Sequence, residues 1–346
     1  MLKRTYILSF ILSVAVATVI CNIKGDSWEE YLRQLYYQNV IHQRIPSTYY
    51  VHVDNKGAPY VEYVDTTGKT IANKYMPTTV AIYALRYYDT IKSTGDKKAV
   101  ERFLNCLECL QDSLTDRGNF ALYEFSYAQP YYSTVGVLWR SGLSSGKAIE
   151  AFTKAYKWSG EEKYLNLALQ LMRGFYVPIQ AGGFTYMNDG DWWYEEYADT
   201  NLLTPRVING HVYAMLGCYE LWLATKNDSA KMVFEKGLNA LKKNIHLYDA
   251  GHGWTYYDAF GKKSDKQYQR TMVDLMAQLY NITGDKLFEE YRTKWSKPLN
   301  TLYLRRIIHE KNKSGILLFL SLTAILYLTI QSSVAFLQHI NRQAST

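Results

Sequence analysis

The chain has 346 residues, of which 48% are hydrophobic and 21% are charged, and its formal net charge is +7. This size and composition exclude a disordered tail, a collagen-like repeat and a disulfide-stapled miniprotein, and they are enough for one or two globular domains. The 32 tyrosines exceed what a core requires, and such aromatic residues often line carbohydrate grooves. The positive charge suits an acidic partner, but no basic motif with interleaved aromatic residues is present, so we expect no nucleic acid.

The four cysteines do not form a metal-binding pattern. Cys106 and Cys109 are the only close pair, and a zinc site would need a second pair. We therefore predict no metal ligands and interpret this pair as two small residues on one face of a helix.

Both ends of the chain are apolar. Lys3 and Arg4 precede an uncharged run from Thr5 to Asn22, so residues 1–24 are predicted to be a signal peptide or a signal anchor. Residues 315–337 carry no charge and are longer than the about 20 apolar residues that cross a bilayer. We predict a transmembrane helix there, after a basic linker at 301–314.

The signal-like start and the charges that flank the second apolar segment indicate opposite membrane topologies. Arg305, Arg306, Lys311 and Lys313 lie on the domain side of the second apolar segment, and only Arg342 lies beyond it. By the positive-inside rule this favours a cytoplasmic domain, whereas the signal-like start favours export. We give more weight to the first segment and predict a membrane-attached protein whose domain between the two apolar segments is extracytoplasmic, in a periplasmic, luminal or cell-surface location.

Between its apolar ends the chain repeats an apolar helix, a short turn and a second amphipathic helix. The turns at 93–96, 158–161, 225–228 and 282–285 lie roughly 65 residues apart. Gly95, Gly160 and Gly284 suit the left-handed position after a helix, and the acidic residue that follows each suits the first turn of the next helix. The pattern predicts four αα-hairpins.

Segments rich in glycine and aromatic residues follow the second helix of the first three hairpins, at 118–125, 182–187 and 251–257. They are typical of short strands or turns. We therefore predict a mainly α fold over residues 75–300, an α/α toroid or incomplete barrel with short β-hairpins in its loops. Residues 25–74 are predicted to hold a helix and a β-hairpin, the latter between Thr48 and Val64.

The densest polar and aromatic cluster runs from Asp189 to Tyr197, and a helical run at 207–213 follows it. Carboxylates beside tyrosines favour an acid–base site, with Glu196 and Tyr197 as the first candidates to act on a sugar. The alternative is an aromatic platform for substrate with solvated acidic residues.

Three segments of this region resemble one protein family: Trp193-Tyr-Glu-Glu-Tyr197, the run from Val207 to Tyr219, and the run from Leu247 to Asp258. In order and spacing they are similar to the C-terminal catalytic domain of heparosan (heparan sulfate) D-glucuronyl C5-epimerases. The resemblance covers residues 75–298.

This resemblance implies an isomerase that removes the C5 proton of a D-glucuronosyl unit in a polysaccharide and returns it on the opposite face, giving L-iduronate. It implies no cofactor. The family's catalytic tyrosines fall on Tyr197, Tyr257 and, in a looser match, Tyr268, with Glu196 and Asn209 as neighbours. Because the C5 proton is weakly acidic, the intermediate's charge needs donors or cations, and a tyrosine base needs neighbours that favour its phenolate.

Other residues near these motifs are candidates to bind the substrate. A guanidinium binds a carboxylate in bidentate fashion, so Arg140, Arg206 and Arg270 are candidates to hold uronate groups, or are surface residues. Trp193 and Tyr194 are candidates to contact the sugar. We interpret His211 and His252, the nearest histidines, as structural or surface residues rather than proton carriers.

The chain also differs from the family. It lacks the large β-sandwich insertion of animal members and passes straight from Lys97 to Leu114. Phe260 stands in place of an arginine after Tyr257, and Met272 stands near the place of a histidine.

Two further functions stay open from the sequence. One is a polysaccharide lyase or glycoside hydrolase on the same fold, the hydrolase using paired carboxylates such as Asp191 and Glu196. The other is a non-catalytic glycan-binding protein. The oligomeric state also stays open, with a homodimer as one alternative.

Overall fold

The computed structural model describes residues 2–40, 49–64, 70–127, 132, 135–136, 138–188, 190–200 and 204–343. The chain divides into two compact units. The larger is Pro46–Ser296, and the smaller combines Met1–Ile45 with Lys297–Thr346.

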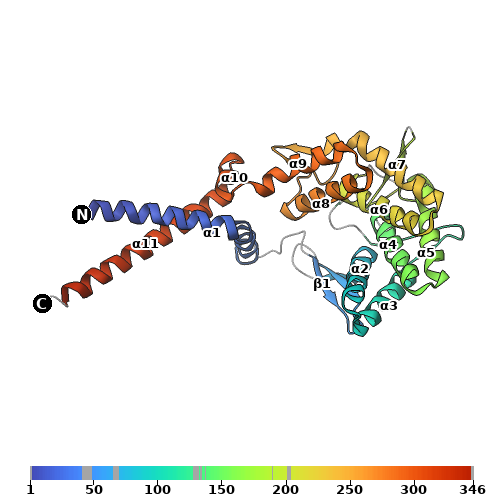
Figure 1. Ribbon diagram of the computed structural model, residues 1–346, viewed down its shortest axis with the longest axis horizontal. Helices are drawn as coiled ribbons and strands as arrows, with labels where there is room; N and C mark the ends of the chain where they lie inside the picture. Colours follow the sequence, from blue (N-terminus) through green and yellow to red (C-terminus); the bar gives the residue numbers. More distant parts are fainter. Residues whose placement is uncertain are drawn as a thin grey trace. The chain divides into compact units, whose positions relative to one another are not determined.

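The larger unit contains the four predicted helical hairpins, which follow one another around an arc (Figure 1). This confirms the predicted α/α toroid. The pairs are α2 (Pro77–Thr94) with α3 (Lys97–Asp112), α4 (Gly142–Ser159) with α5 (Glu162–Arg173), α6 (Ile208–Thr225) with α7 (Asp228–Asn244), and α8 (Lys266–Thr283) with α9 (Lys286–Asn300).

The hairpin turns have the predicted backbone. Gly95, Gly160 and Gly284 have φ angles of 69°, 73° and 67°, which are left-handed values that glycine adopts without strain. The acidic residue lies one position earlier than expected in the first of these turns, at the N-cap. There the Asp96 carboxylate accepts a hydrogen bond of 2.9 Å from the Lys98 amide.

The first helices of successive hairpins pack on one another, α2 on α4, α4 on α6 and α6 on α8, while α3, α5 and α7 each pack on their own partner. The contact between α4 and α6 is very close. A Cβ atom at Gly146 would overlap the backbone of Ala214, and one at Gly217 would overlap the backbone of Gly146. Glycine is therefore required at this crossing.

Short antiparallel strand pairs occupy the glycine- and aromatic-rich loops, as predicted. An additional pair joins Glu124–Phe125 to Trp139–Arg140, and the sequence did not indicate it. The strands are β4 (Thr115–Asp116) with β5 (Ala121–Leu122), β6 (Glu124–Phe125) with β7 (Trp139–Arg140), β8 (Thr185–Asn188) with β9 (Asp191–Tyr194), and β10 (Asp249–Gly251) with β11 (Trp254–Thr255).

A three-stranded antiparallel sheet precedes the first hairpin and belongs to the larger unit. Its strands are β1 (Tyr49–Val53), β2 (Pro59–Val64) and β3 (Thr70–Lys74). The predicted β-hairpin is β1–β2, with Tyr49 opposite Tyr63, and its predicted first residue, Thr48, lies outside the described residues. The third strand was not predicted.

The smaller unit contains α1 (Leu2–Asn39), α10 (Tyr303–His309) and α11 (Lys313–Gln343). In the described part of the chain, two segments are long and apolar enough to cross a membrane, Arg4–Glu29 and Lys313–Gln338. The helices α1 and α11 pack on each other, and α10, inside the predicted linker, contacts both.

Candidate active site

The segment after β9 carries Glu196 and Tyr197 into the interior of the larger unit. Both side chains are only 7% exposed. The backbones of Arg140 and Ala198 exchange hydrogen bonds of 2.9 and 2.8 Å, which fix this segment against β7. Asp189, the first residue of the cluster indicated by the sequence, lies outside the described residues.

Tyr257 reaches the same place from the loop after β11. Its carbonyl accepts a hydrogen bond of 3.2 Å from the Ile208 amide at the start of α6, and its own amide donates to the Lys262 carbonyl at 2.6 Å. The ring of Tyr257 lies 4.7 Å from the ring of Tyr268, measured between centroids, in an edge-on arrangement. Tyr268 is half-buried in the first turn of α8, where its amide donates to the Asp265 carboxylate.

Glu196 is the residue with which both Tyr197 and Tyr257 interact. Burial raises the pKa of its carboxyl group to about 7, although hydrogen bonding from Tyr197 and Tyr257 and the positive charge of Lys262 act in the opposite direction. Its Oε2 atom has no hydrogen-bond partner among the described residues. A carboxyl group with a pKa near neutrality exchanges its proton readily at physiological pH.

The tyrosines themselves are poor acids in this environment. Burial raises the pKa of Tyr197 and of Tyr257, and the negative charge of Glu196 raises both further. Both hydroxyl groups are therefore protonated at neutral pH and are proton donors. Either tyrosine becomes a base only after its proton has moved to an acceptor such as Glu196.

Lys262 places a cation beside this group. Its Nζ atom lies 5.4 Å from the ring centroid of Tyr257 and 5.6 Å from that of Tyr132. Asp258 holds the loop, because its carboxylate accepts hydrogen bonds of 3.0 Å from the amides of Phe260 and Lys262 and one of 2.5 Å from the Tyr132 hydroxyl. The sequence analysis missed Lys262, Asp258 and Tyr132 as site residues. The available signal was a lysine two positions after Phe260, which replaces the family's arginine.

The predicted arginines have different environments. The Arg140 Nε atom donates to the Glu124 carboxylate at 2.9 Å, while its buried Nη1 atom has no hydrogen-bond partner in the part of the chain that the structure describes. The Arg140 backbone pairs with Ala198, the residue after Tyr197, and its side chain keeps one donor that no described protein group satisfies. Arg270 is exposed on α8, and no described contact joins it to the cluster around Glu196. Arg206 contacts the motif through its backbone, because its amide donates a hydrogen bond of 3.1 Å to the Glu195 carboxylate.

Trp193 and Tyr194, which the sequence suggested as substrate-binding residues, are enclosed in the core. Tyr194 is 0% exposed, and its hydroxyl donates to the Val233 carbonyl at 2.6 Å. Trp193 stacks on His211 with ring centroids 4.0 Å apart. These contacts give both residues a structural role, because their aromatic faces are already covered by protein.

His211 supports this core. Its Nδ1 atom accepts a hydrogen bond of 3.0 Å from the Tyr194 amide, and its Nε2 atom donates to the Gly237 carbonyl at 2.9 Å. Burial lowers the pKa of His211 to about 4, so the ring is neutral at physiological pH. His252 is exposed. The predicted structural and surface roles agree with these positions.

Asn209 lies in the first turn of α6, one residue before Gly210. It is 6% exposed, and its Oδ1 atom has no partner within the described ranges. Its neighbour Gly210 faces Glu196 so closely that a Cβ atom there would overlap the carboxylate. The Asn209 side chain therefore keeps a buried acceptor that no described protein group satisfies.

Two other carboxylates of the motif have different surroundings. Burial raises the pKa of Glu195 to about 8. Asp191 forms an ion pair of 2.8 Å with Lys243, outside the tyrosine cluster. The carboxylate pair that a hydrolase would use, Asp191 with Glu196, is therefore not set up as a matched acid and base.

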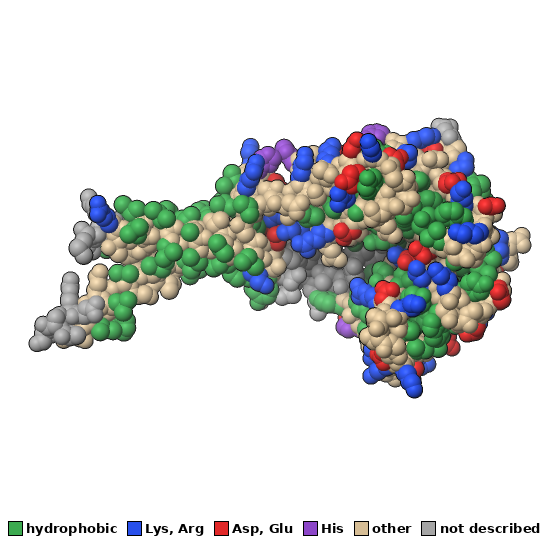
Figure 2. Space-filling model, viewed as in Figure 1, with side chains coloured by type: hydrophobic (Ala, Val, Ile, Leu, Met, Phe, Trp, Pro, Cys, Tyr) green, Lys and Arg blue, Asp and Glu red, His purple; other side chains and the backbone are tan. Residues whose placement is uncertain are grey.

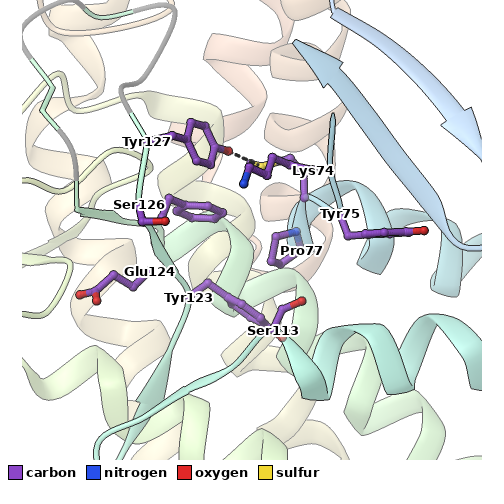
Figure 3. Close-up of a pocket in the computed structure, with 10 residues that line it drawn as sticks. Lys74, Tyr75, Pro77, Ser113, Tyr123, Glu124, Ser126 and Tyr127 are labelled. Carbon is purple, nitrogen blue, oxygen red and sulfur yellow. Dashed lines mark hydrogen bonds between the residues drawn. The ribbon is translucent and has the colours of Figure 1, made fainter. Parts of the chain in front are cut away.

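A cavity of about 150 Å³ lies near Arg140, lined by residues that include Lys74, Tyr75, Glu124 and Tyr127 (Figure 3). Phe125 in its lining stacks on Trp139 with centroids 4.0 Å apart, and Trp139 lies 5.4 Å from Tyr197. Aromatic rings thus connect the cavity with the tyrosine cluster. Among the described residues, no group of three or more His, Cys, Asp or Glu side chains could hold a metal ion.

The sequence profile of the family described as D-glucuronyl C5-epimerase C-terminus matches residues 119–297, which is more than half of the chain. The chain belongs to this family. This confirms the resemblance seen in the motifs around Glu196, and family membership supports a carbohydrate epimerase activity.

The individual relatives have low sequence identity to this chain. An uncharacterized protein of Methanocaldococcus jannaschii is 28% identical over 313 residues, which are 85% of this chain and 99% of that protein. A D-glucuronyl C5-epimerase of Caenorhabditis elegans is 28% identical over 176 residues, which are 45% of this chain but only 28% of the nematode protein.

The family fold is also seen in solved structures. A sugar epimerase from a ruminal bacterium matches with a TM-score of 0.52 at 17% identity, covering 84% of this chain and 74% of that one. This likeness concerns the fold.

Proposed function

We propose that the larger unit is a uronosyl C5-epimerase that converts D-glucuronosyl into L-iduronosyl units within a heparosan-like polysaccharide. One observation supports this most directly. The hydroxyl groups of Tyr197 and Tyr257 hydrogen-bond to one buried carboxyl group, that of Glu196, whose pKa is near neutrality. A reaction that removes a proton and returns it on the opposite face needs two proton-transfer groups of this kind.

The proposed reaction breaks the C5–H bond and places its electron pair in the adjacent carboxylate, giving a dianionic enediolate. A tyrosine on one face accepts the C5 proton after passing its own proton to Glu196. A tyrosine on the other face donates its hydroxyl proton to C5. Tyr197 serves one face, and Tyr257 or Tyr268 serves the other.

Two cations suit the charge that develops on the uronate. Lys262 lies beside Tyr257, and Arg140, whose backbone pairs with Ala198 next to Tyr197, keeps a buried Nη1 donor without a partner among the described residues. Donors already fixed by the protein stabilise a developing anion more than mobile water does, because they need no reorganisation. The Asn209 side chain would complete the contacts to the sugar.

The enzyme is proposed to act outside the cytoplasm while attached to a membrane through its apolar helices. Its partners would be a uronate-containing polysaccharide and the lipid bilayer, and it would need no metal or organic cofactor for proton transfer.

The test is solvent deuterium incorporation by the full chain, purified in detergent and incubated with heparosan or N-sulfated heparosan in deuterated water. We expect deuterium at C5, read by NMR, with unchanged chain length. New unsaturated ends absorbing in the ultraviolet would instead identify a lyase, and new reducing ends a hydrolase. If a panel of uronate polymers bound without any reaction, the epimerase proposal would be wrong and a glycan-binding protein would remain.

A further inference from the structure

The helices α1 and α11 expose large apolar side chains over most of their length. Leu8 is 65% exposed and Ile23 70% on α1, and Leu317 is 66% exposed and Phe336 64% on α11. Hydrophobic side chains cover much of the visible surface of both helices (Figure 2). Soluble monomers rarely expose continuous apolar surface of this extent.

Where α1 meets α11, its residues are small. They recur every fourth position, which places them on one face of the helix, and each is at most 5% exposed. This stripe consists of Ser9, Ser13, Ala17 and Cys21. Small residues let two helix backbones approach closely, which is how helices associate inside a bilayer.

The two helices run antiparallel. Cys21 packs with Tyr303 and Ile307, just before α11 begins, whereas Phe10 packs edge-on against Tyr327, far along α11, with ring centroids 6.3 Å apart. The N- and C-terminal ends of the pair therefore lie at the same end (Figure 1).

Several hydroxyl groups within the apolar stretches donate hydrogen bonds to carbonyl groups of their own helix. Ser13 donates to the Ser9 carbonyl at 2.7 Å, Thr18 to Val14 at 2.8 Å, and Thr323 to Phe319 at 2.8 Å. In hydrocarbon no water is available for a polar group, so this internal pairing is what a bilayer requires.

Polar contacts gather instead at the other end of the pair, in a cluster that we call the clasp: Asn22, Asp26 and Glu29 of α1 with Tyr303, Arg306, Asn312 and Ser314. The Glu29 carboxylate accepts hydrogen bonds from the Tyr303 hydroxyl at 2.9 Å, the Asn312 amide at 3.0 Å and the Ser314 hydroxyl at 2.6 Å. Arg306 forms an ion pair with Asp26. The clasp joins the end of the first apolar stretch to the start of the second.

We propose that α1 and α11 form an antiparallel two-helix anchor in a lipid bilayer, with the clasp at one surface and both ends of the chain at the other, which the extracytoplasmic location proposed above makes the cytoplasmic surface. Each candidate span has 26 residues and is about 39 Å long, more than the roughly 30 Å of hydrocarbon. The chain leaves the anchor after Glu29 and returns at Tyr303, so residues 46–296 stand on the clasp side.

The proposal requires that residues 1–24 are a retained signal anchor and not a cleaved signal peptide. Cleavage of a signal peptide there would remove the stripe of small residues that α11 packs against. The first helix is therefore a retained part of the anchor. This proposal deepens the membrane attachment given above and does not depend on the epimerase reaction.

The test uses the full chain with an epitope tag at each end, in sealed membrane vesicles of known orientation. In inside-out vesicles, added protease is expected to remove both tags and to leave the domain 46–296 protected. Opposite behaviour of the two tags, loss of the N-terminal tag during maturation, or release of the protein by alkaline carbonate would each overturn the proposal. None of these readouts depends on enzymatic activity.

A cross-link tests the pairing directly. In a chain whose native cysteines are replaced by serine, Phe10→Cys with Tyr327→Cys should react with a short bismaleimide, so that the two ends stay joined after protease cleavage between them. The matched control is Leu8→Cys with Tyr327→Cys, because Leu8 is 65% exposed and does not face Tyr327. If the first pair links no better than the control, or links only separate chains, the antiparallel pairing is wrong.

Discussion

The carboxylate of Glu196 lies directly against the backbone of Gly210 in the first turn of α6, so closely that a Cβ atom at Gly210 would overlap it. A side chain of any size at residue 210 must displace Glu196 from the tyrosines. We expect Gly210→Ala to reduce epimerase activity by displacing the Glu196 carboxyl group, with a stability loss of about 1–3 kcal/mol from overpacking. C5 exchange and thermal unfolding of the same preparation check this. Full activity with unchanged stability would mean that Glu196 is free to move away.

Tyr197→Phe and Tyr257→Phe each remove one hydroxyl and little packing. Loss of a general acid or base typically costs a factor of about 10² to 10⁴ in rate, and we expect losses in this range for both variants. The assay should start from glucuronate-rich and from iduronate-rich polymer, because a tyrosine that serves one face limits the two directions differently. Tyr186→Phe, a half-buried tyrosine of β8, is the matched control and should keep full activity. Retained exchange in Tyr197→Phe would remove that residue from the mechanism.

The pH dependence of the protein's stability follows from the titration of Glu196. Its pKa is raised from 4.5 to about 7 by burial, so folding favours its protonated form. The stability that this group contributes is complete below pH 4.5 and is lost as pH rises towards 7. We therefore expect Glu196→Gln to stabilise the protein above pH 7 by up to about 3 kcal/mol while abolishing activity. Chemical unfolding at pH 5 and pH 8.5 measures the difference, and an equal effect at both values would contradict the raised pKa.

Lys262 lowers the pKa of Glu196. Replacing it by an uncharged residue should therefore raise that pKa and move the ascending limb of the activity profile to higher pH. We expect Lys262→Gln to show this shift together with a lower rate, and Lys262→Arg to keep most of the wild-type profile. Lys263→Gln, next to it in the same loop, is the control. A lower rate without a shift would assign Lys262 to substrate binding alone.

The Arg306 side chain is 8% exposed, whereas its partner Asp26 is 34% exposed. Leaving a buried charge without a partner costs more than leaving an exposed one. Asp26→Ala should therefore destabilise the anchor, and the double variant Asp26→Ala with Arg306→Leu should recover much of that loss. Resistance of the anchor to protease in detergent on heating measures this, while the thermal transition of the domain 46–296 should not change. Additive losses in the double variant would mean that the pair is not coupled.

Local sequence features determined the hairpins of this protein. Helical periodicity and the left-handed glycines Gly95, Gly160 and Gly284 act within a few residues, so they can be read without knowing the fold. The motif around Glu196 and Tyr197 likewise identified the family, and it supplied Tyr197 as a candidate catalytic residue.

Only the tertiary structure showed which members of that motif are enclosed in the core. Trp193 and Tyr194 adjoin Glu196 in sequence but pack into the core against His211 and Val233, because burial depends on neighbours far along the chain. The third strand of the sheet, β3, which pairs with β2, was also missed.

The remaining site residues come together over long separations. Tyr132 bonds to Asp258 across 126 positions, and this contact fixes the loop that carries Lys262. The clasp joins Glu29 to Tyr303 across 274 positions. No periodicity or turn signal encodes contacts over such sequence separations. These contacts form only when the hairpins close into a toroid and the two apolar helices pack together.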